Sequence, residues 1–216
     1  MNLLDSHDTD RLGSMIVNVD SRYDHNIGVA DNHDYKVRKP NADEVRIQKL
    51  IIMFQMTYLG APMVYYGDEA GMWGADDPDE RKPMLWNDMK YEDESHHPFG
   101  LSRPVDRNEF NKGLFEWYRK LIGLRRSHPA LSLGDFTTVA ADDVKLIYAF
   151  KRSYKNSHVL VVINNSDQAC NVSIPMDDSR TEWKRVLSPG RAIIDGGILK
   201  LKLKAKTGEV LEGVRR

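Results

Sequence analysis

The sequence predicts an α/β segment followed by an all-β domain, and three observations support this fold class. First, two short apolar runs flank one strongly helical stretch, which is the order of strand, helix and strand in a parallel crossover unit. Second, the C-terminal part holds short, often alternating runs between turn residues, as in an antiparallel sandwich. Third, the chain contains no internal repeat. The predicted domains are residues 1–131 and 132–216.

The first apolar run, at residues 2–4, predicts the end of a buried strand, and a stretch rich in Asp, Asn and His follows it. A helix is predicted next, because apolar residues recur at helical spacing up to residue 58. Asn41 or Asp43 can cap its N-terminus, and Glu44 lies in the first turn, where the helix dipole favours a carboxylate. Glycine and proline at positions 60 and 62 end the helix.

The second apolar run covers residues 63–66 and leads into a segment without periodicity that extends to about residue 108. Loops of this length are usually functional or disordered. The aromatic content favours an ordered loop, and its aromatic residues are Trp73, Trp86, Tyr91 and Phe99. A second helix is predicted over residues 109–126, because its apolar side chains fall on one face and two arginines lie in the last turn.

Six short strands are predicted in the rest of the chain. They cover residues 145–152, 158–164, 169–175, 182–187, 191–195 and 198–203. Turn segments rich in Asn, Ser, Gly and Pro separate them, which favours an antiparallel arrangement. The α/β part is incomplete by itself, because two strands cannot close a parallel barrel.

The bulk composition describes an ordinary soluble protein, with 41% apolar residues, 29% charged residues and a net charge of −1. Without a basic excess, neither nucleic acid nor an anionic membrane is an expected partner. The chain has no run long enough to span a bilayer and no signal peptide at Met1. The single cysteine, Cys170, lacks companions for a disulfide or a zinc site. The compartment stays open between cytoplasm and periplasm.

The first candidate for chemistry is the segment Ser-His-Asp-Thr-Asp-Arg at residues 6–11, directly after an apolar run. In α/β barrels, catalytic side chains project from the C-terminal ends of strands. His7 and Asp8 could there hydrogen-bond two neighbouring hydroxyls of a sugar. Taken alone, these residues favour a simpler role, in which Asp8 or Thr9 caps a turn or a helix.

The second candidate is the segment at residues 60–86, which joins the second apolar run to an acidic loop. A buried strand followed by a turn explains its first part. It does not explain the loop behind that strand, which carries Asp77, Arg81, Trp73 and Trp86.

Together the two segments resemble the α-amylase family of glycoside hydrolases. Ser-His-Asp-Thr at residues 6–9 is similar to the family's fourth sequence region, at the end of the seventh barrel strand. Tyr-Tyr-Gly-Asp-Glu-x-Gly-Met at residues 65–72 is similar to the end of the eighth strand, and residues 114–136 resemble the last barrel helix and the start of the β-sandwich domain. The loop at residues 77–84 most resembles the neopullulanase, cyclomaltodextrinase and maltogenic amylase subgroup.

The resemblance implies the C-terminal part of a (β/α)8 TIM barrel, with its last two strands and helices, followed by an antiparallel β-sandwich domain. It also implies that His7 and Asp8 contact hydroxyls of the sugar ring that is cleaved. Such bonds strengthen as the ring flattens toward an oxocarbenium-like transition state. Asp77 and Arg81 would hold sugar hydroxyls further toward the non-reducing side.

A tryptophan of the loop, Trp73 or Trp86, would either stack on a sugar face or simply pack the loop, and both alternatives stay open. Of the two, Trp73 is the one predicted to bind substrate. The pair His96-His97 is more typical of a solvated surface than of a metal site, because adjacent side chains rarely converge on one ion. No metal or other cofactor is predicted for this chain. Calcium stays open for the parent enzyme, since the family's calcium sites mostly involve earlier segments.

One departure from the family bears on activity. A retaining glycosidase needs two carboxyl groups roughly 5 Å apart, one of them a nucleophile. In the family this nucleophile lies in a Gly-x-Arg-x-Asp pattern, which the sequence lacks. Six of the eight barrel strands are also missing ahead of His7. We therefore expect part of a retaining α-glucan hydrolase that is inactive alone, with an α-glucan oligosaccharide and the missing N-terminal barrel segment as partners.

The expected parent cleaves α-1,4 glucosidic bonds in starch-derived oligosaccharides, cyclodextrin or pullulan, and α-1,6 bonds stay open. Two alternatives are a non-catalytic carbohydrate-binding or assembly module and a transglycosylase of the same family. The presence of His7, Asp8, Asp77 and Arg81 favours descent from a working enzyme, because a scaffold has no need of them.

Overall fold

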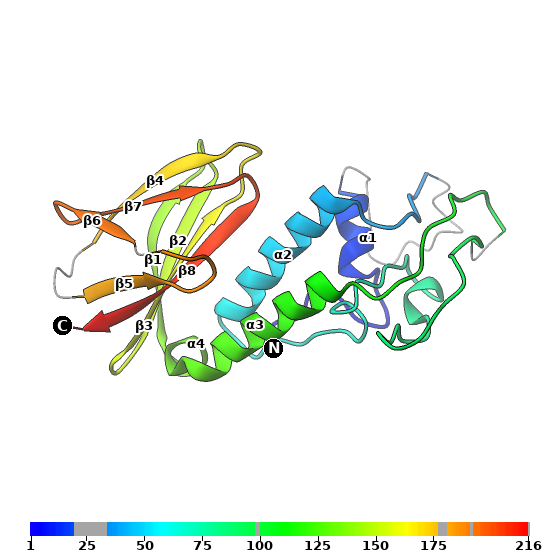
Figure 1. Ribbon diagram of the computed structural model, residues 1–216, viewed down its shortest axis with the longest axis horizontal. Coiled ribbons are helices and arrows are strands. Elements are labelled where there is room, and N and C mark those ends of the chain that lie inside the picture. Colours follow the sequence, from blue (N-terminus) through cyan, green and yellow to red (C-terminus); the bar gives the residue numbers. More distant parts are fainter. Residues whose placement is uncertain (20–33, 98–99, 177–180, 191, 216) are drawn as a thin grey trace. The chain divides into compact units, whose positions relative to one another are not determined.

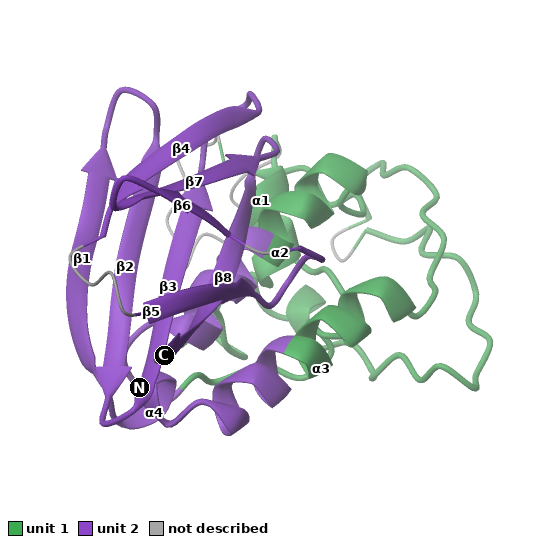
Figure 2. Cartoon of the chain, turned by 60° about the vertical axis from the view of Figure 1, so that its left-hand side comes forward, with its two compact units in different colours: residues 1–49, 62–120 green, residues 50–61, 121–216 purple. Residues whose placement is uncertain are grey.

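The computed structural model describes residues 1–19, 34–97, 100–176, 181–190 and 192–215, and Figure 1 shows the order of its elements. The chain forms two compact units. The first comprises residues 1–49 and 62–120, and the second comprises residues 50–61 and 121–216 (Figure 2). No helix of the described residues has both the length and the apolar character needed to cross a membrane.

The first unit contains a short helix, α1 (Leu12–Val17), that the sequence pattern does not predict. The Oδ2 atom of Asp5 accepts a hydrogen bond from the amide of Leu12 at 2.7 Å and satisfies one of the free donors at the helix start. The apolar side chains of Leu12, Ile16 and Val17 are buried. Six residues are too few to show a helical period in the sequence, which explains the omission.

The two predicted strands of this unit meet in the parallel direction, as expected. Asn2 and Pro62 form an isolated parallel bridge, and the amide of Met63 donates to the carbonyl oxygen of Asn2 at 2.9 Å. The pairing is shorter than predicted, because residues 2–4 and 63–66 do not form regular strands in the described part of the chain. Two short strands need further neighbours before they make a stable sheet.

Helix α2 (Ala42–Thr57) begins with a reciprocal capping box, and Asn41 is the cap of the two predicted candidates. Its Oδ1 atom accepts from the amides of Asp43 at 2.9 Å and Glu44 at 3.0 Å, while Glu44 Oε2 accepts from the amide of Asn41 at 2.7 Å. The guanidinium of Arg38 also hydrogen-bonds Glu44 and lowers the pKa of that carboxyl group.

Helix α3 (Lys112–Ser127) begins three residues later than the predicted helix. Asn111 caps it, because its Oδ1 atom accepts from the amide of Leu114 at 3.0 Å. Within the first unit, the indole nitrogen of Trp117 donates to the carbonyl oxygen of Lys49 on α2 at 2.9 Å. The two helices that the sequence predicts are thus present and joined by a polar contact.

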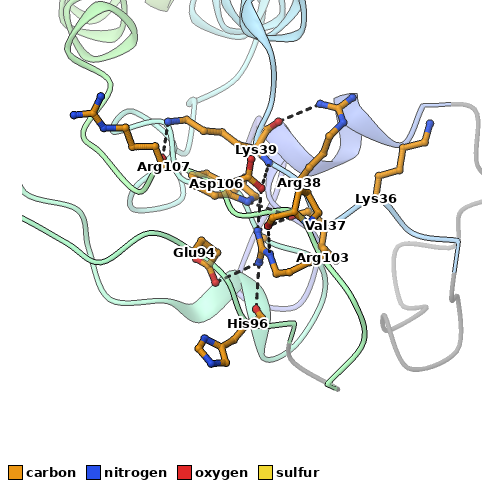
Figure 3. A network of polar contacts seen from close by, with 12 residues as sticks. Lys36, Val37, Arg38, Lys39, Glu94, His96, Arg103, Asp106 and Arg107 are labelled. Atoms are coloured by element: carbon orange, nitrogen blue, oxygen red, sulfur yellow. Dashed lines mark hydrogen bonds and ion pairs between the residues drawn. The ribbon is translucent and has the colours of Figure 1, made fainter.

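A polar network centred on Arg103 holds part of the long loop of the first unit (Figure 3). The Arg103 side chain is fully buried and forms ion pairs with Glu94 at 3.3 Å and Asp106 at 3.2 Å. It also donates to the carbonyl oxygens of Val37 at 3.2 Å and His96 at 3.3 Å. The described part of the loop is therefore held by buried polar contacts, and Phe99, one of its four aromatic residues, lies outside the described residues.

The second unit is an antiparallel β-sandwich, as predicted, with sheets in the order β1-β2-β3-β8-β5 and β4-β7-β6 (Figure 2). The strands are β1 (Asp135–Asp142), β2 (Ile147–Tyr154), β3 (Ser157–Asn164), β4 (Cys170–Pro175), β5 (Thr181–Arg185), β6 (Ile193–Asp195), β7 (Ile198–Leu203) and β8 (Thr207–Arg215). Both sheets contribute to one apolar core, in which Leu160, Val162, Ile174, Leu199 and Leu211 are fully or almost fully buried. Burial of this alternating face is what stabilises the sandwich.

Three elements of the second unit escape prediction from the sequence: β1, β8 and the short helix α4 (Pro129–Leu133). Strand β1 lies at the edge of its sheet and none of its residues is fully buried, so it lacks an apolar alternation. Strand β8 lies inside the sheet, but Gly208 and Glu209 interrupt its apolar pattern. The other six strands match the six predicted runs to within about two residues at most ends.

Candidate functional site

A tight turn presents His7 and Asp8 to solvent just after the parallel bridge. The amide of Ser6 donates to Thr9 Oγ1 at 3.0 Å, and the amide of Asp8 donates to Ser6 Oγ at 3.2 Å. The side chains of His7 and Asp8 are 68% and 67% exposed, and their Nε2 and Oδ2 atoms are 3.2 Å apart. Both predicted residues are therefore free to meet a ligand. The side chains of Ser6 and Thr9 also shape the turn, so the simpler interpretation holds for Thr9, whereas Asp8 contributes only its backbone amide.

The acidic loop folds back onto this turn through the 3-10 helix η1 (Asp79–Arg81). Arg81 lies at its end, and its Nε atom donates to the carbonyl oxygen of His7 at 2.9 Å. Its Nη2 atom lies 3.4 Å from Asp8 Oδ1 and 3.1 Å from Asp77 Oδ2. The structure thus brings His7, Asp8, Asp77 and Arg81 into one cluster, across more than 70 residues of sequence.

Arg11 connects the turn that carries His7 and Asp8 to the loop that carries Asp77 and Arg81. The sequence pattern assigns no such role to Arg11. Its side chain is fully buried, and its Nε atom donates to the carbonyl oxygen of Glu80 at 2.8 Å. Its Nη1 atom donates to the carbonyl oxygen of Tyr66 at 2.7 Å and to Asp68 Oδ1 at 3.1 Å. The guanidinium also lies over the ring of Tyr65, 4.4 Å from its centroid. One side chain therefore connects the His7 segment to both halves of the second segment.

A second buried carboxyl group, Asp5, lies close to Asp68 beneath the cluster. Burial raises the pKa of Asp68 well above its usual range, Asp5 raises it further, and Arg11 opposes the shift. The same buried carboxyl groups contribute to a raised pKa of the Tyr118 hydroxyl, for which burial is the main cause. Asp5, Asp68 and Arg11 therefore form a buried group of ionisable side chains next to the cluster, and Arg11 is its cation.

The two loop tryptophans differ in their environment. Trp73 is only 2% exposed, its indole nitrogen donates to the carbonyl oxygen of Val37 at 3.2 Å, and the ammonium groups of Lys39 and Lys82 lie over its ring. The prediction that Trp73 stacks on a sugar therefore needs correction, because its ring faces are covered and it packs the loop. Trp86 is 55% exposed.

Trp86 lines a pocket of about 600 Å³ with Tyr66, Met84, Phe110 and Phe115. The amide of Trp86 donates to the hydroxyl of Tyr91 at 2.6 Å, which holds the turn that presents the indole. These aromatic and apolar residues make up half of the lining, and the other half is polar or charged: Glu69, Asn87, Asp88, Lys112 and Glu116.

The histidine pair of the loop separates into one exposed and one buried side chain. His96 is exposed, whereas His97 is buried, which corrects the expectation of a solvated pair. No group of three or more metal-ligating side chains with suitable geometry occurs in the part of the chain that the structure describes.

Comparison with known proteins identifies relatives of both parts of the chain. Residues 1–134 match the family described as the α-amylase catalytic domain, and residues 136–207 match the maltogenic amylase C-terminal domain. Neopullulanase 2 of Thermoactinomyces vulgaris is 34% identical over 212 residues, which are 97% of this chain and 28% of that protein. A cyclomaltodextrinase of Thermoanaerobacter pseudethanolicus is 39% identical over 120 residues, or 56% of this chain and 17% of that protein.

Solved structures show the same fold. A cyclomaltodextrinase superposes with a TM-score of 0.69 at 26% identity and covers 99% of this chain and 29% of its own length. The α-amylase of Geobacillus thermoleovorans, solved with acarbose, superposes with a TM-score of 0.70 at 24% identity and covers 99% of this chain and 38% of its own. The chain spans less than a third of the length of the curated relatives described above.

Proposed function

The chain belongs to the α-amylase family of glycoside hydrolases, and from this premise we propose that it supplies part of the glucan-binding site of a retaining α-glucan hydrolase. The boundary between its barrel segment and its sandwich lies between residues 131 and 132 in this proposal, within the short helix α4 that precedes β1. The parent's substrate is an α-1,4-linked oligosaccharide derived from starch, a cyclodextrin or pullulan. The names of the relatives, neopullulanase and cyclomaltodextrinase, support this choice.

The observation that carries the proposal is the Arg81 guanidinium, which contacts Asp8, Asp77 and the backbone of His7 at once. Carboxylates accept hydrogen bonds from sugar hydroxyls, and a guanidinium or an imidazole N–H donates to hydroxyl oxygens. The cluster therefore offers alternating donors and acceptors on one exposed surface, which suits the neighbouring hydroxyls of a pyranose ring. Trp86, which is more than half exposed, is the tryptophan that we propose to stack on a sugar ring.

In the proposed reaction, His7 and Asp8 hold hydroxyls of the ring at the cleavage site, and their bonds shorten as that ring flattens toward the oxocarbenium-like transition state. Asp77 and Arg81 hold the next ring toward the non-reducing end. Charge-assisted hydrogen bonds are the stronger class, so Asp8, Asp77 and Arg81 contribute most to the affinity.

This chain by itself does not cleave glucans in the proposal. Retaining hydrolysis needs a carboxylate nucleophile and a carboxylic acid roughly 5 Å apart. The sequence lacks the Gly-x-Arg-x-Asp pattern of the family's nucleophile. Within the cluster, Asp8 and Asp77 both form ion pairs with Arg81, at 3.4 Å and 3.1 Å, and serve as hydrogen-bond acceptors in the proposal. The remaining barrel segment of the parent therefore supplies the two catalytic carboxyl groups.

The expected result is binding without hydrolysis. The purified 216-residue chain should release no glucose or maltose from cyclodextrin or pullulan, yet bind maltoheptaose in a calorimetric titration. Arg81→Met should weaken this binding about tenfold to a hundredfold, since a hydrogen bond to a charged group contributes about 1.5–3 kcal/mol.

Arg119→Met is the matched control, because Arg119 is an exposed arginine on α3 that pairs only with Glu116 among its described contacts. The affinity of the Arg119→Met variant for maltoheptaose should equal that of the unmodified chain. Release of glucose or maltose would contradict the proposal that this chain alone does not cleave glucans. An affinity of Arg81→Met equal to that of Arg119→Met would contradict the proposal that Arg81 binds the sugar.

A further inference from the structure

Glu80 is a buried carboxylate directly beside the exposed Arg81. The whole of residue Glu80 is 0% exposed, whereas the side chain of Arg81 is 44% exposed. The Oε1 atom of Glu80 accepts from Arg81 Nε at 2.9 Å, and its Oε2 atom has no hydrogen-bond partner among the described residues. A buried carboxylate is unfavourable unless it is paired, so its position calls for an explanation beyond solvation.

The backbone of Glu80 is fixed from the opposite side. Its carbonyl oxygen accepts from Arg11 Nε at 2.8 Å, and the hydroxyl of Tyr65 lies 3.5 Å away. Arg11 itself is fully buried. Because η1 is held in this way, the Glu80 carboxylate has little freedom to follow movements of Arg81.

The fixed carboxylate restrains the guanidinium of Arg81. The Nε–H group of Arg81 is shared between Glu80 Oε1 and the carbonyl oxygen of His7, each at 2.9 Å. A planar guanidinium that is held at Nε has the direction of its Nη atoms set as well. The Nη2 atom consequently faces Asp8 and Asp77. Without this restraint, a long exposed side chain would populate several rotamers.

We propose that Glu80 is a positioning residue, whose carboxylate holds the Nε edge of Arg81 so that Nη2 is presented to a sugar hydroxyl together with Asp8 and Asp77. The inference rests on the proposed function for the ligand, but the restraint on Arg81 is a property of the free chain. Burial raises the pKa of Glu80 and the hydrogen bond from Arg81 opposes this shift, as expected for a carboxylate that is kept buried by one cationic partner.

The test follows the guanidinium signal of Arg81 by NMR in the free chain and then repeats the maltoheptaose titration. Glu80→Leu removes the acceptor and should accelerate hydrogen exchange at Arg81 Nε about tenfold and weaken maltoheptaose binding about threefold to fivefold, which corresponds to about 0.6–1 kcal/mol. Glu80→Gln keeps an oxygen acceptor at the same place. It should restore most of the slow hydrogen exchange at Arg81 Nε and most of the affinity for maltoheptaose. A merely structural role would not produce this selective rescue at Arg81.

The control is Glu116→Leu, which removes the partner of Arg119 on the exposed face of α3 and should leave the Arg81 signal unchanged. An unchanged Arg81 signal in Glu80→Leu would overturn the inference. If Glu80→Leu fails to fold, Glu80→Asp replaces it, because withdrawing the carboxylate by one methylene should also speed exchange at Arg81. The free-chain signal is measured without a glucan, so a failure of the proposed function, seen as no maltoheptaose binding, leaves this readout intact.

Discussion

Replacing Arg11 by methionine is expected to lower the free energy of unfolding of the first unit by about 3–5 kcal/mol, the range observed when one partner of a buried ion pair is removed. Methionine fills much of the same volume, so the loss comes from polar partners rather than from a cavity. The carbonyl oxygen of Tyr66 loses its donor, that of Glu80 keeps only the hydroxyl of Tyr65 at 3.5 Å, and Asp68 loses its cation. A buried acceptor that loses its only partner contributes about 1–3 kcal/mol to this loss.

The deficit of Arg11→Met should shrink as the pH is lowered. The pKa of Asp68 is already raised by burial and by Asp5, and removal of Arg11 raises it further. A carboxyl group with a raised pKa in the folded state binds a proton more tightly there, so stability rises as the pH falls toward that pKa. Protonated Asp68 then needs no counter-ion. The variant should therefore lie closest to the unmodified chain at acid pH.

Denaturant unfolding monitored by hydrogen exchange at the amides of α1 would measure this effect. Arg119→Met is the control and should change stability by less than about 1 kcal/mol, as is usual for an exposed ion pair. An Arg11→Met variant as stable as this control would show that the guanidinium does not connect the two halves of the cluster.

The second large effect is expected for Arg152→Met in the second unit, with a loss of about 3–5 kcal/mol from several unsatisfied buried carbonyl groups. The Arg152 side chain donates five hydrogen bonds, all of them to backbone carbonyl oxygens. The acceptors are Thr57, Tyr58, Leu131, Gly134 and Asp135, at 3.0 to 3.2 Å. The first two lie at the C-terminal end of α2, where carbonyl groups have no partner within the helix and the dipole favours a cation.

Burial lowers the pKa of Arg152, and the nearby charge of Arg125 lowers it further. Arg125 cannot take over the role, because it already donates to the carbonyl oxygens of Met56, Tyr58 and Gly60. Hydrogen exchange at the amides of β3 should report the loss. Lys200→Met, which removes an exposed lysine of β7 that pairs with Asp195, is the matched control. Equal protection of β3 in the two variants would contradict this explanation.

The elements that the sequence predicts are those whose side chains repeat over a sufficient length. Helix α3 and strands such as β7 show a clear period, because one face of each is buried. Helix α1 is too short for such a repeat, and Glu209 interrupts the apolar alternation of β8. Glu209 is buried because Arg185, the amide of Leu187 and the hydroxyl of Ser188 all donate to its carboxylate. A buried strand that contains a charged residue can be predicted only when the partners of that residue are known.

The candidate site divides in the same way. His7, Asp8, Asp77 and Arg81 can be singled out because each lies in a short motif whose residue types suit hydroxyl recognition. The roles of Arg11 and Trp73 depend on partners tens of residues away, which no local pattern encodes. Burial separates Trp73 from Trp86, although the two tryptophans are equivalent in the sequence.

The most direct test of the account is a titration of the chain with maltoheptaose in which the ring signals of His7 and the guanidinium signal of Arg81 are followed by NMR. The account predicts that both signals shift along one saturating curve, because the two side chains share one ligand, while the amide of Lys200 in the sandwich stays unchanged. Shifts confined to the sandwich, or no shift of His7 and Arg81 at the solubility limit of the sugar, would contradict the claim that this cluster binds an α-glucan.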